Sequence, residues 1–163
     1  MNRLKNLVVL IVLCCFFAGS AFVPPGLRAQ DGGGDMKNIL MIVDGRNFRD
    51  EELFQPMEKF EKAGFKVTVA SVTAETARGM LGGKVKPDLA LKDVAPGDYK
   101  AVVFVGGGGA AQYFDDPVAH KIAQDTAKSE NIIAAICIAP VILAKAGVLK
   151  GKTLDSRPVC RLR

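Results

Sequence analysis

The feature that most constrains this chain is the stretch from Asn131 to Gly147, which reads NIIAAICIAPVILAKAG. The apolar run at 132–136 is too short for a helix and has the length of a buried strand, whereas Pro140 and the apolar residues after it are typical of a first helical turn. This pattern places Cys137 where a strand turns into a helix. Ala135 and Ala139 are small, as such a tight turn requires. We therefore predict a strand–cysteine–helix elbow.

Cys137 has two interpretations at this position. The positive end of the following helix favours a thiolate, which is the reactive form of cysteine. An inert place in the core is the alternative, because free cysteine is among the most buried residue types. The sequence nominates Cys137 as a nucleophile and leaves the second interpretation open.

The rest of the chain alternates strands with helices. We predict strands at 38–43, 65–72, 88–91, 99–105 and 132–136, helices at 50–63 and 117–127, a turn at 44–47 and an irregular excursion at 73–87. Continuous apolar strands separated by helices are typical of an α/β domain whose mostly parallel sheet is covered on both faces.

In the first helix, Asp50 and Glu51 are interpreted as carboxylates that stabilise its N-terminus. In the second, Asp115 and Asp116 predict the cap, Val118 is expected to face inward, and His120 is expected on the surface.

The N-terminal segment has the pattern of a secretory signal peptide. It begins with basic residues, continues with an apolar run from Leu7 to about Phe17 and ends in small residues. We predict a signal peptide at 1–29, a linker at 30–35 and a domain at 36–163, with export to the periplasm or the extracellular space and no membrane association after cleavage. An uncleaved anchor, or a lipid on Cys14 or Cys15, is the alternative.

Charge and motifs exclude several classes of function. Of the 22 basic residues, Arg3, Lys5 and Arg28 lie in the N-terminal segment, which leaves 19 against 17 acidic residues and no nucleic-acid footprint. CxxC, HExxH and His/Cys clusters do not occur in the sequence, so it indicates no metal site. The run GGGGAAQ lacks the dinucleotide spacing, and no cofactor is expected. A disulfide between Cys137 and Cys160 is left unassigned.

Four segments together carry a resemblance to a known family: NFRDEELFQP, VVFVGGGGAAQ, AAICIAP and AKAGVLKGK. In this combination, from about Met36 to Lys152, the chain resembles the ThiJ/PfpI superfamily, which contains PfpI-type intracellular proteases and DJ-one type deglycases. The resemblance implies a three-layer α/β/α sandwich like that of class I glutamine amidotransferases. It also implies that Cys137 is the reactive residue, that Glu52 hydrogen-bonds it, and that Gly106 and Gly107 line the cysteine pocket.

Two departures from that family bear on function. Ile138 stands in the pocket where PfpI-type members have a histidine directly after the cysteine. After Lys152 the chain changes character to TLDSRPVCRLR, so we expect a fold incomplete at its C-terminus, with one sheet edge and part of a dimer surface unbuilt.

Three functions remain open on the sequence alone. The first is a hydrolase, deglycase or glyoxalase-like enzyme acting on small carbonyl compounds or peptides, with a homodimer allowed. The second is a redox or stress-responsive protein in which Cys137 is reversibly oxidised. The third is an inactive truncated homologue.

Overall fold

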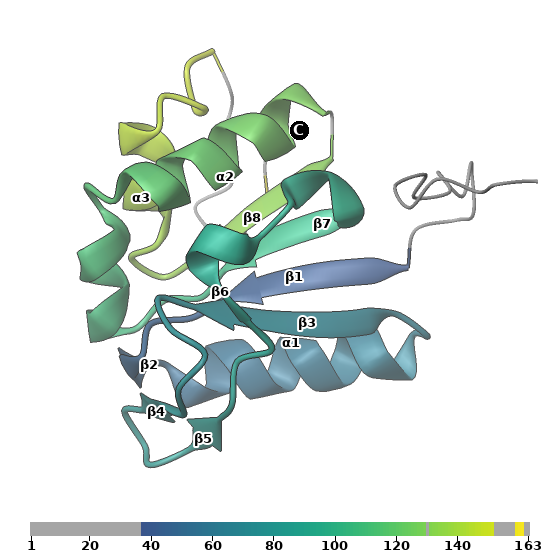
Figure 1. Ribbon diagram of the computed structural model, residues 1–163, viewed down its shortest axis with the longest axis vertical. Helices are drawn as coiled ribbons and strands as arrows, with labels where there is room; N and C mark the ends of the chain where they lie inside the picture. The colour runs from purple at the N-terminus through teal and green to yellow at the C-terminus, as the bar shows by residue number, and fades with distance from the viewer. Residues whose placement is uncertain (1–36, 130, 152–158, 162–163) are drawn as a thin grey trace, which may run out of the picture. The chain divides into compact units, whose positions relative to one another are not determined.

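The computed structural model describes residues 37–129, 131–151 and 159–161 (Figure 1). The predicted signal peptide, 1–29, and the linker, 30–35, lie outside these residues. Across the part described, no helix is both long and apolar enough to cross a membrane.

A six-stranded sheet forms the centre of the domain, in the order β6-β3-β1-β7-β8-β9. The pairs β1–β3, β1–β7, β3–β6 and β7–β8 are parallel, as the continuous apolar strands predicted, and β8–β9 is antiparallel. The strands are β1 (Asn38–Ile42), β3 (Lys66–Ser71), β6 (Leu89–Ala90), β7 (Ala101–Phe104), β8 (Ile132–Ile136) and β9 (Val159–Arg161).

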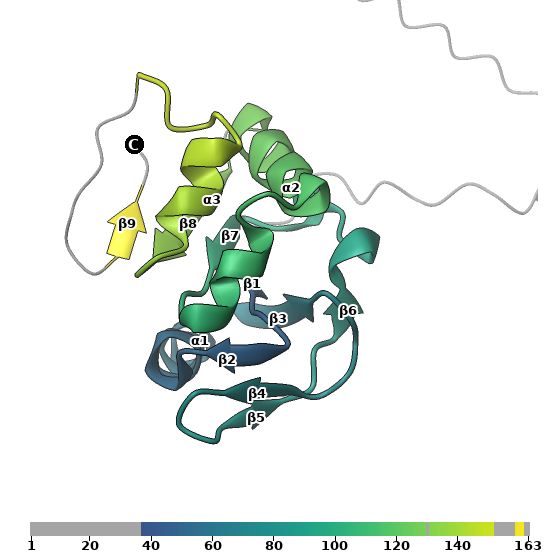
Figure 2. The ribbon, with the colours of Figure 1, turned by 90° about the vertical axis from the view of Figure 1, so that its left-hand side faces the viewer.

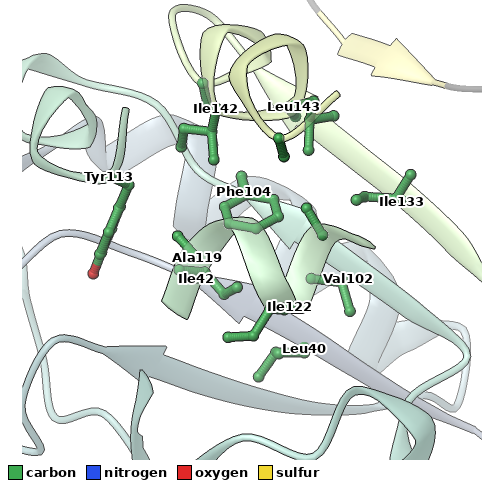
Figure 3. Packing of buried hydrophobic residues seen from close by; sticks show 14 of the residues in the cluster. Leu40, Ile42, Val102, Phe104, Tyr113, Ala119, Ile122, Ile133, Ile142 and Leu143 are labelled. Atoms are coloured by element: carbon green, nitrogen blue, oxygen red, sulfur yellow. The ribbon is translucent and has the colours of Figure 1, made fainter. Parts of the chain in front are cut away.

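Helices cover both faces of this sheet, which confirms the three-layer α/β/α sandwich (Figure 1). The α-helices are α1 (Asp50–Lys62), α2 (Pro117–Lys128) and α3 (Pro140–Lys145). Three short 3-10 helices lie between α1 and α2 in the chain: η1 (Leu91–Asp93), η2 (Pro96–Asp98) and η3 (Gly108–Tyr113). Successive strand residues point to opposite faces and so divide the core in two. Leu40, Val102 and Phe104 pack with α2 and α3 (Figure 3), whereas Met41 and Val103 pack with Leu53 of α1.

A second, three-stranded sheet contains β2 (Arg46–Phe48), β4 (Ala77–Gly79) and β5 (Lys84–Val85), in the order β2-β4-β5 (Figure 2). The prediction of a simple turn at 44–47 is wrong in part, because Arg46 and Asn47 belong to β2. The segment at 73–87, predicted to be irregular, contains β4 and β5; β4 pairs with β2, and β5 pairs with β4. Phe48, Ala77 and Val85 pack against the α1 side of the core, and this burial fixes the small sheet in place.

Among the residues described, one further strand follows β8 in the central sheet. Strand β9 pairs with β8, and Cys160 stands opposite Ala135. On α2, Asp116 is the N-cap and accepts hydrogen bonds from the N–H groups of Val118 and Ala119, as predicted. Val118 is 38% exposed rather than inward-facing, because Ala119, Ile122 and Ala123 supply the buried stripe of this helix.

Candidate functional site: the cysteine elbow

The predicted elbow is present at the carboxyl end of β8. Strand β8 ends at Ile136, α3 begins at Pro140, and between them Cys137 has a φ of 59°, in the left-handed region that non-glycine residues rarely adopt. Ala135 and Ala139 are fully buried against the core. Cys137 is free and exposed, so it does not have the buried core position that was the alternative. Rare backbone conformations of this kind concentrate at functional sites.

Gly106 packs between Cys137 and Glu52. Its N–H donates a 3.0 Å hydrogen bond to Glu52 Oε2, and its carbonyl accepts one of 3.1 Å from the Arg49 N–H. A Cβ on Gly106 would lie 2.5 Å from Glu52 Oε2 and 2.7 Å from Cys137 Cβ. Only glycine allows the carboxyl and the cysteine to approach the same backbone atom from two sides.

Glu52 lies in the first turn of α1, as the resemblance implied. Burial raises the pKa of its carboxyl above the ordinary value, and hydrogen bonds from Gly106 N–H and with the Cys137 side chain partly offset that rise. Glu52 therefore holds its proton to a higher pH than an exposed glutamate. A neutral carboxyl beside sulfur can donate a hydrogen bond to a thiolate or to an oxygen bound at sulfur.

The other predicted pocket residues occupy distinct positions. The Gly106 N–H is engaged by Glu52, so of the two glycines the Gly107 N–H is the better candidate for an external anion. Gly107 has a φ of 100°, and a Cβ there would meet the backbone of Asn47 at 2.5 Å, which requires glycine at this position. Ile138 follows the cysteine and is 37% exposed.

Asp50 has a structural role that the sequence analysis missed. Its side chain lies in the first turn of α1 as predicted, but it is also buried and accepts hydrogen bonds from Leu81 N–H (2.8 Å) and Gly83 N–H (2.7 Å). These bonds, that from Leu81 foremost, lower the pKa of Asp50. A Cβ on Gly79 or Gly83 would overlap its carboxylate. Gly79 and Gly83 in the 73–87 segment were the only sequence feature that could have indicated this close contact with Asp50.

The environments of Glu51 and His120 are closer to those that the sequence predicted. Glu51 forms a 2.9 Å ion pair with Arg49 on a partly exposed part of α1. His120 is half-buried rather than fully solvated, and its Nε2 lies 2.8 Å from the carbonyl oxygen of Phe114. This contact ties the ring to the segment that precedes its own helix.

The segment after the glycine run is anchored by two further contacts that the sequence did not predict. The Tyr113 hydroxyl donates a 2.8 Å hydrogen bond to the Val43 carbonyl, and burial raises the pKa of Tyr113 to about 12. The Gln112 side chain donates to the buried Asp44 carboxylate. Both contacts hold η3 against the end of β1 and so fix the segment into which the glycine run leads.

Comparisons with known proteins agree with this geometry. A family model described as the DJ-1/PfpI family matches residues 37–162. An uncharacterized protein of Methanocaldococcus jannaschii, MJ0967, is 36% identical over 158 residues, which cover 95% of this chain and 75% of that protein. Deglycase PYRAB04690 of Pyrococcus abyssi is 33% identical over 119 residues, which cover 73% of this chain and 72% of that protein.

Solved structures give the same result. The crystal structure of a ThiJ/PfpI domain protein from Brachyspira murdochii superposes with a TM-score of 0.69 at 40% identity, over 71% of this chain and 67% of that one. Oxidized DJ-1 of Toxoplasma gondii superposes with a TM-score of 0.67 at 28% identity, over 74% of this chain and 67% of that one. The sheet order, the elbow and these matches together show that the chain belongs to the DJ-1/PfpI family.

Proposed function

We propose that this protein is a cysteine-dependent enzyme of the deglycase or glyoxalase type that acts on small carbonyl compounds, with Cys137 as the nucleophile. The observation that carries this proposal is the exposed Cys137, held at a left-handed φ beside the carboxyl of Glu52. Relatives named deglycase in Pyrococcus abyssi and glutathione-independent glyoxalase in Caenorhabditis elegans support the reaction class.

The chemistry proposed at the elbow is addition of sulfur to a carbonyl carbon. The Cys137 thiolate forms a carbon–sulfur bond, and the carbonyl electron pair moves to oxygen, which then takes a proton from Glu52. The Gly107 N–H and the Ile138 N–H, which directly follows the nucleophile, are the proposed donors to that developing oxyanion. Ile138 cannot transfer a proton, so we expect feeble peptide hydrolysis, whose amine leaving group requires one.

The test is an assay of the purified protein on methylglyoxal and on a peptide substrate. We expect aldehyde turnover to disappear in Cys137→Ser and to fall by about 10²- to 10⁴-fold in Glu52→Leu, because general acid–base help is lost. His120→Ala serves as the control and should leave the turnover unchanged. Aldehyde turnover that survives Cys137→Ser, or robust proteolysis that depends on His120, would refute the proposal.

Reversible oxidation of Cys137 is a second candidate function. Its support is the exposed thiol next to a carboxyl whose pKa is raised by burial and which can hydrogen-bond a sulfenate, the reversible oxidation product. Peroxide titration followed by intact-mass measurement distinguishes the two candidates. A redox sensor should gain oxygen at Cys137 at low peroxide and show no aldehyde turnover beforehand, whereas the enzyme should lose turnover on oxidation.

A further inference from the structure

A row of three cations crosses the small sheet on its solvent side. Arg46 of β2 is the register partner of Arg78 of β4, and Arg78 is the register partner of Lys84 of β5. All three residues are exposed. Like charges directly opposite each other on neighbouring strands repel, and none of the three is ion-paired within residues 37–129, 131–151 and 159–161. We call these three residues the cation row.

The backbone of the small sheet orients the row outward. Arg78 and Lys84 alternate with Ala77 and Val85, which pack on the core side. On β2 the register shifts between Arg46 and Phe48, and Asn47 between them has a φ of 66°. This irregularity lets Phe48 enter the core while Arg46 joins the outer face. The position of the row therefore follows from a specific backbone distortion.

Two members of the row open onto a cleft at the carboxyl ends of β1 and β3. Its volume is about 390 Å³, which is the size of a small-molecule site. Arg46 and Arg78 line it together with polar side chains and two carboxylates. The complete lining is Asp44, Gly45, Arg46, Val72, Thr73, Glu75, Thr76, Arg78 and Gln112.

Two carboxylates, Asp44 and Glu75, share the cleft with the arginines. Asp44 is buried, accepts a hydrogen bond from Gln112, and has a pKa raised chiefly by burial, although the charge of Arg46 acts in the opposite direction. Glu75 is exposed, and its own N–H lies 3.4 Å from the Thr73 hydroxyl in the loop after β3. The cleft therefore combines two arginines with carboxylate, hydroxyl and amide groups that can form hydrogen bonds with hydroxyls.

We propose that this cleft binds a small hydroxylated molecule carrying a phosphate or carboxylate group, whose anionic group lies on Arg46 and Arg78 while its hydroxyls face Asp44, Thr73 and Gln112. Arginine pairs match the oxygen geometry of both anions. None of these residues belongs to the cysteine elbow. The inference therefore stands whether or not Cys137 catalyses a reaction.

The test is calorimetric titration with glycerol 3-phosphate and with glycerate, which share hydroxyls and differ in the anionic group. Glycerol and sodium chloride at matched ionic strength are the blanks. We expect at least one of the two anions to bind, and Arg46→Ala or Arg78→Ala to weaken that binding about tenfold or more. Comparison of the two anions decides between phosphate and carboxylate.

Three controls keep the result specific. Lys92→Ala removes an exposed positive charge from η1, and Cys137→Ser alters the elbow; both should bind as the parent does. Without ligand and at low salt, Arg78→Gln should be at least as stable as the parent because a repulsion is removed. Failure of both anions to exceed the blanks, or equal binding by the arginine variants, would overturn the proposal.

Discussion

At the scale of single residues, the site depends on the absence of one side chain. Gly106→Ala would place a methyl group 2.6 Å from the Ile136 carbonyl and against Glu52 and Cys137. We expect a loss of about 1–3 kcal/mol in unfolding free energy, as in other overpacked sites, together with loss of aldehyde turnover. Chemical denaturation and the turnover assay measure both effects.

Gly108→Ala is the matched control for that substitution, since a Cβ at this exposed position meets nothing within 4 Å. It should retain the stability and the turnover of the parent. If Gly106→Ala behaved like Gly108→Ala, the close packing of Glu52 and Cys137 around Gly106 would not exist in solution.

Glu52 makes stability depend on pH. Because burial raises its folded-state pKa above the ordinary 4.5, the folded protein binds this proton more tightly than the unfolded chain, so stability falls as pH rises through and above that value. Glu52→Gln removes the titration and keeps an acceptor for Gly106. We expect its melting temperature to exceed that of the parent at pH 7, with a difference that shrinks toward pH 4.

Thermal melts between pH 4 and 8 measure this difference. Glu61→Gln, which changes an exposed carboxylate on the same helix, provides the comparison and should follow the parent curve. Parallel curves for Glu52→Gln and the parent would show that Glu52 has an ordinary pKa in the folded protein.

At the scale of elements, Asp50 connects α1 to the turn between β4 and β5. Its two hydrogen bonds from Leu81 and Gly83 require an ionised carboxylate for full strength, and because its folded-state pKa is lowered, this stabilisation is present at neutral pH and lost in acid. Asp50→Ala should lower the melting temperature and loosen this turn.

Limited proteolysis at neutral pH tests the role of Asp50, with cleavage expected within 79–83 in Asp50→Ala and not in the parent. Glu51→Ala, its neighbour on a partly exposed ion pair, should resist cleavage as the parent does, because such pairs contribute about 0–1 kcal/mol. Equal resistance of Asp50→Ala would mean that β4 and β5 hold the turn without it.

At the scale of the whole molecule, the N-terminal segment predicts that the protein is exported. The segment at 1–29 predicts a mature protein that begins after Ala21 or at Gln30 outside the cytoplasm. N-terminal sequencing of the protein from fractionated cells should find one of these starts in the exported fraction. An intact Met1 in the soluble cytoplasmic fraction would contradict the prediction.

The sequence by itself determined five strands of the central sheet, the helices and the elbow, because apolar periodicity, Pro140 and the small residues around Cys137 act locally. It also nominated Glu52 and Gly106, though only through their likeness to a family pattern. Local rules of this kind carry information over a few residues. They therefore predict the elements with a clear apolar pattern, and most of the faces that those elements bury.

The tertiary structure alone decided the contacts between distant segments. The sequence places Asp50 in the first turn of a helix, but only the fold brings the N–H groups of Leu81 and Gly83 to its carboxylate. Likewise, the excursion forms a sheet by pairing with β2. Arg46 and Arg78 are 32 residues apart in the sequence and become neighbours because β2 pairs with β4. Side-chain roles that depend on such long-range pairing have no local signature, and for that reason the cation row was visible only in the folded chain.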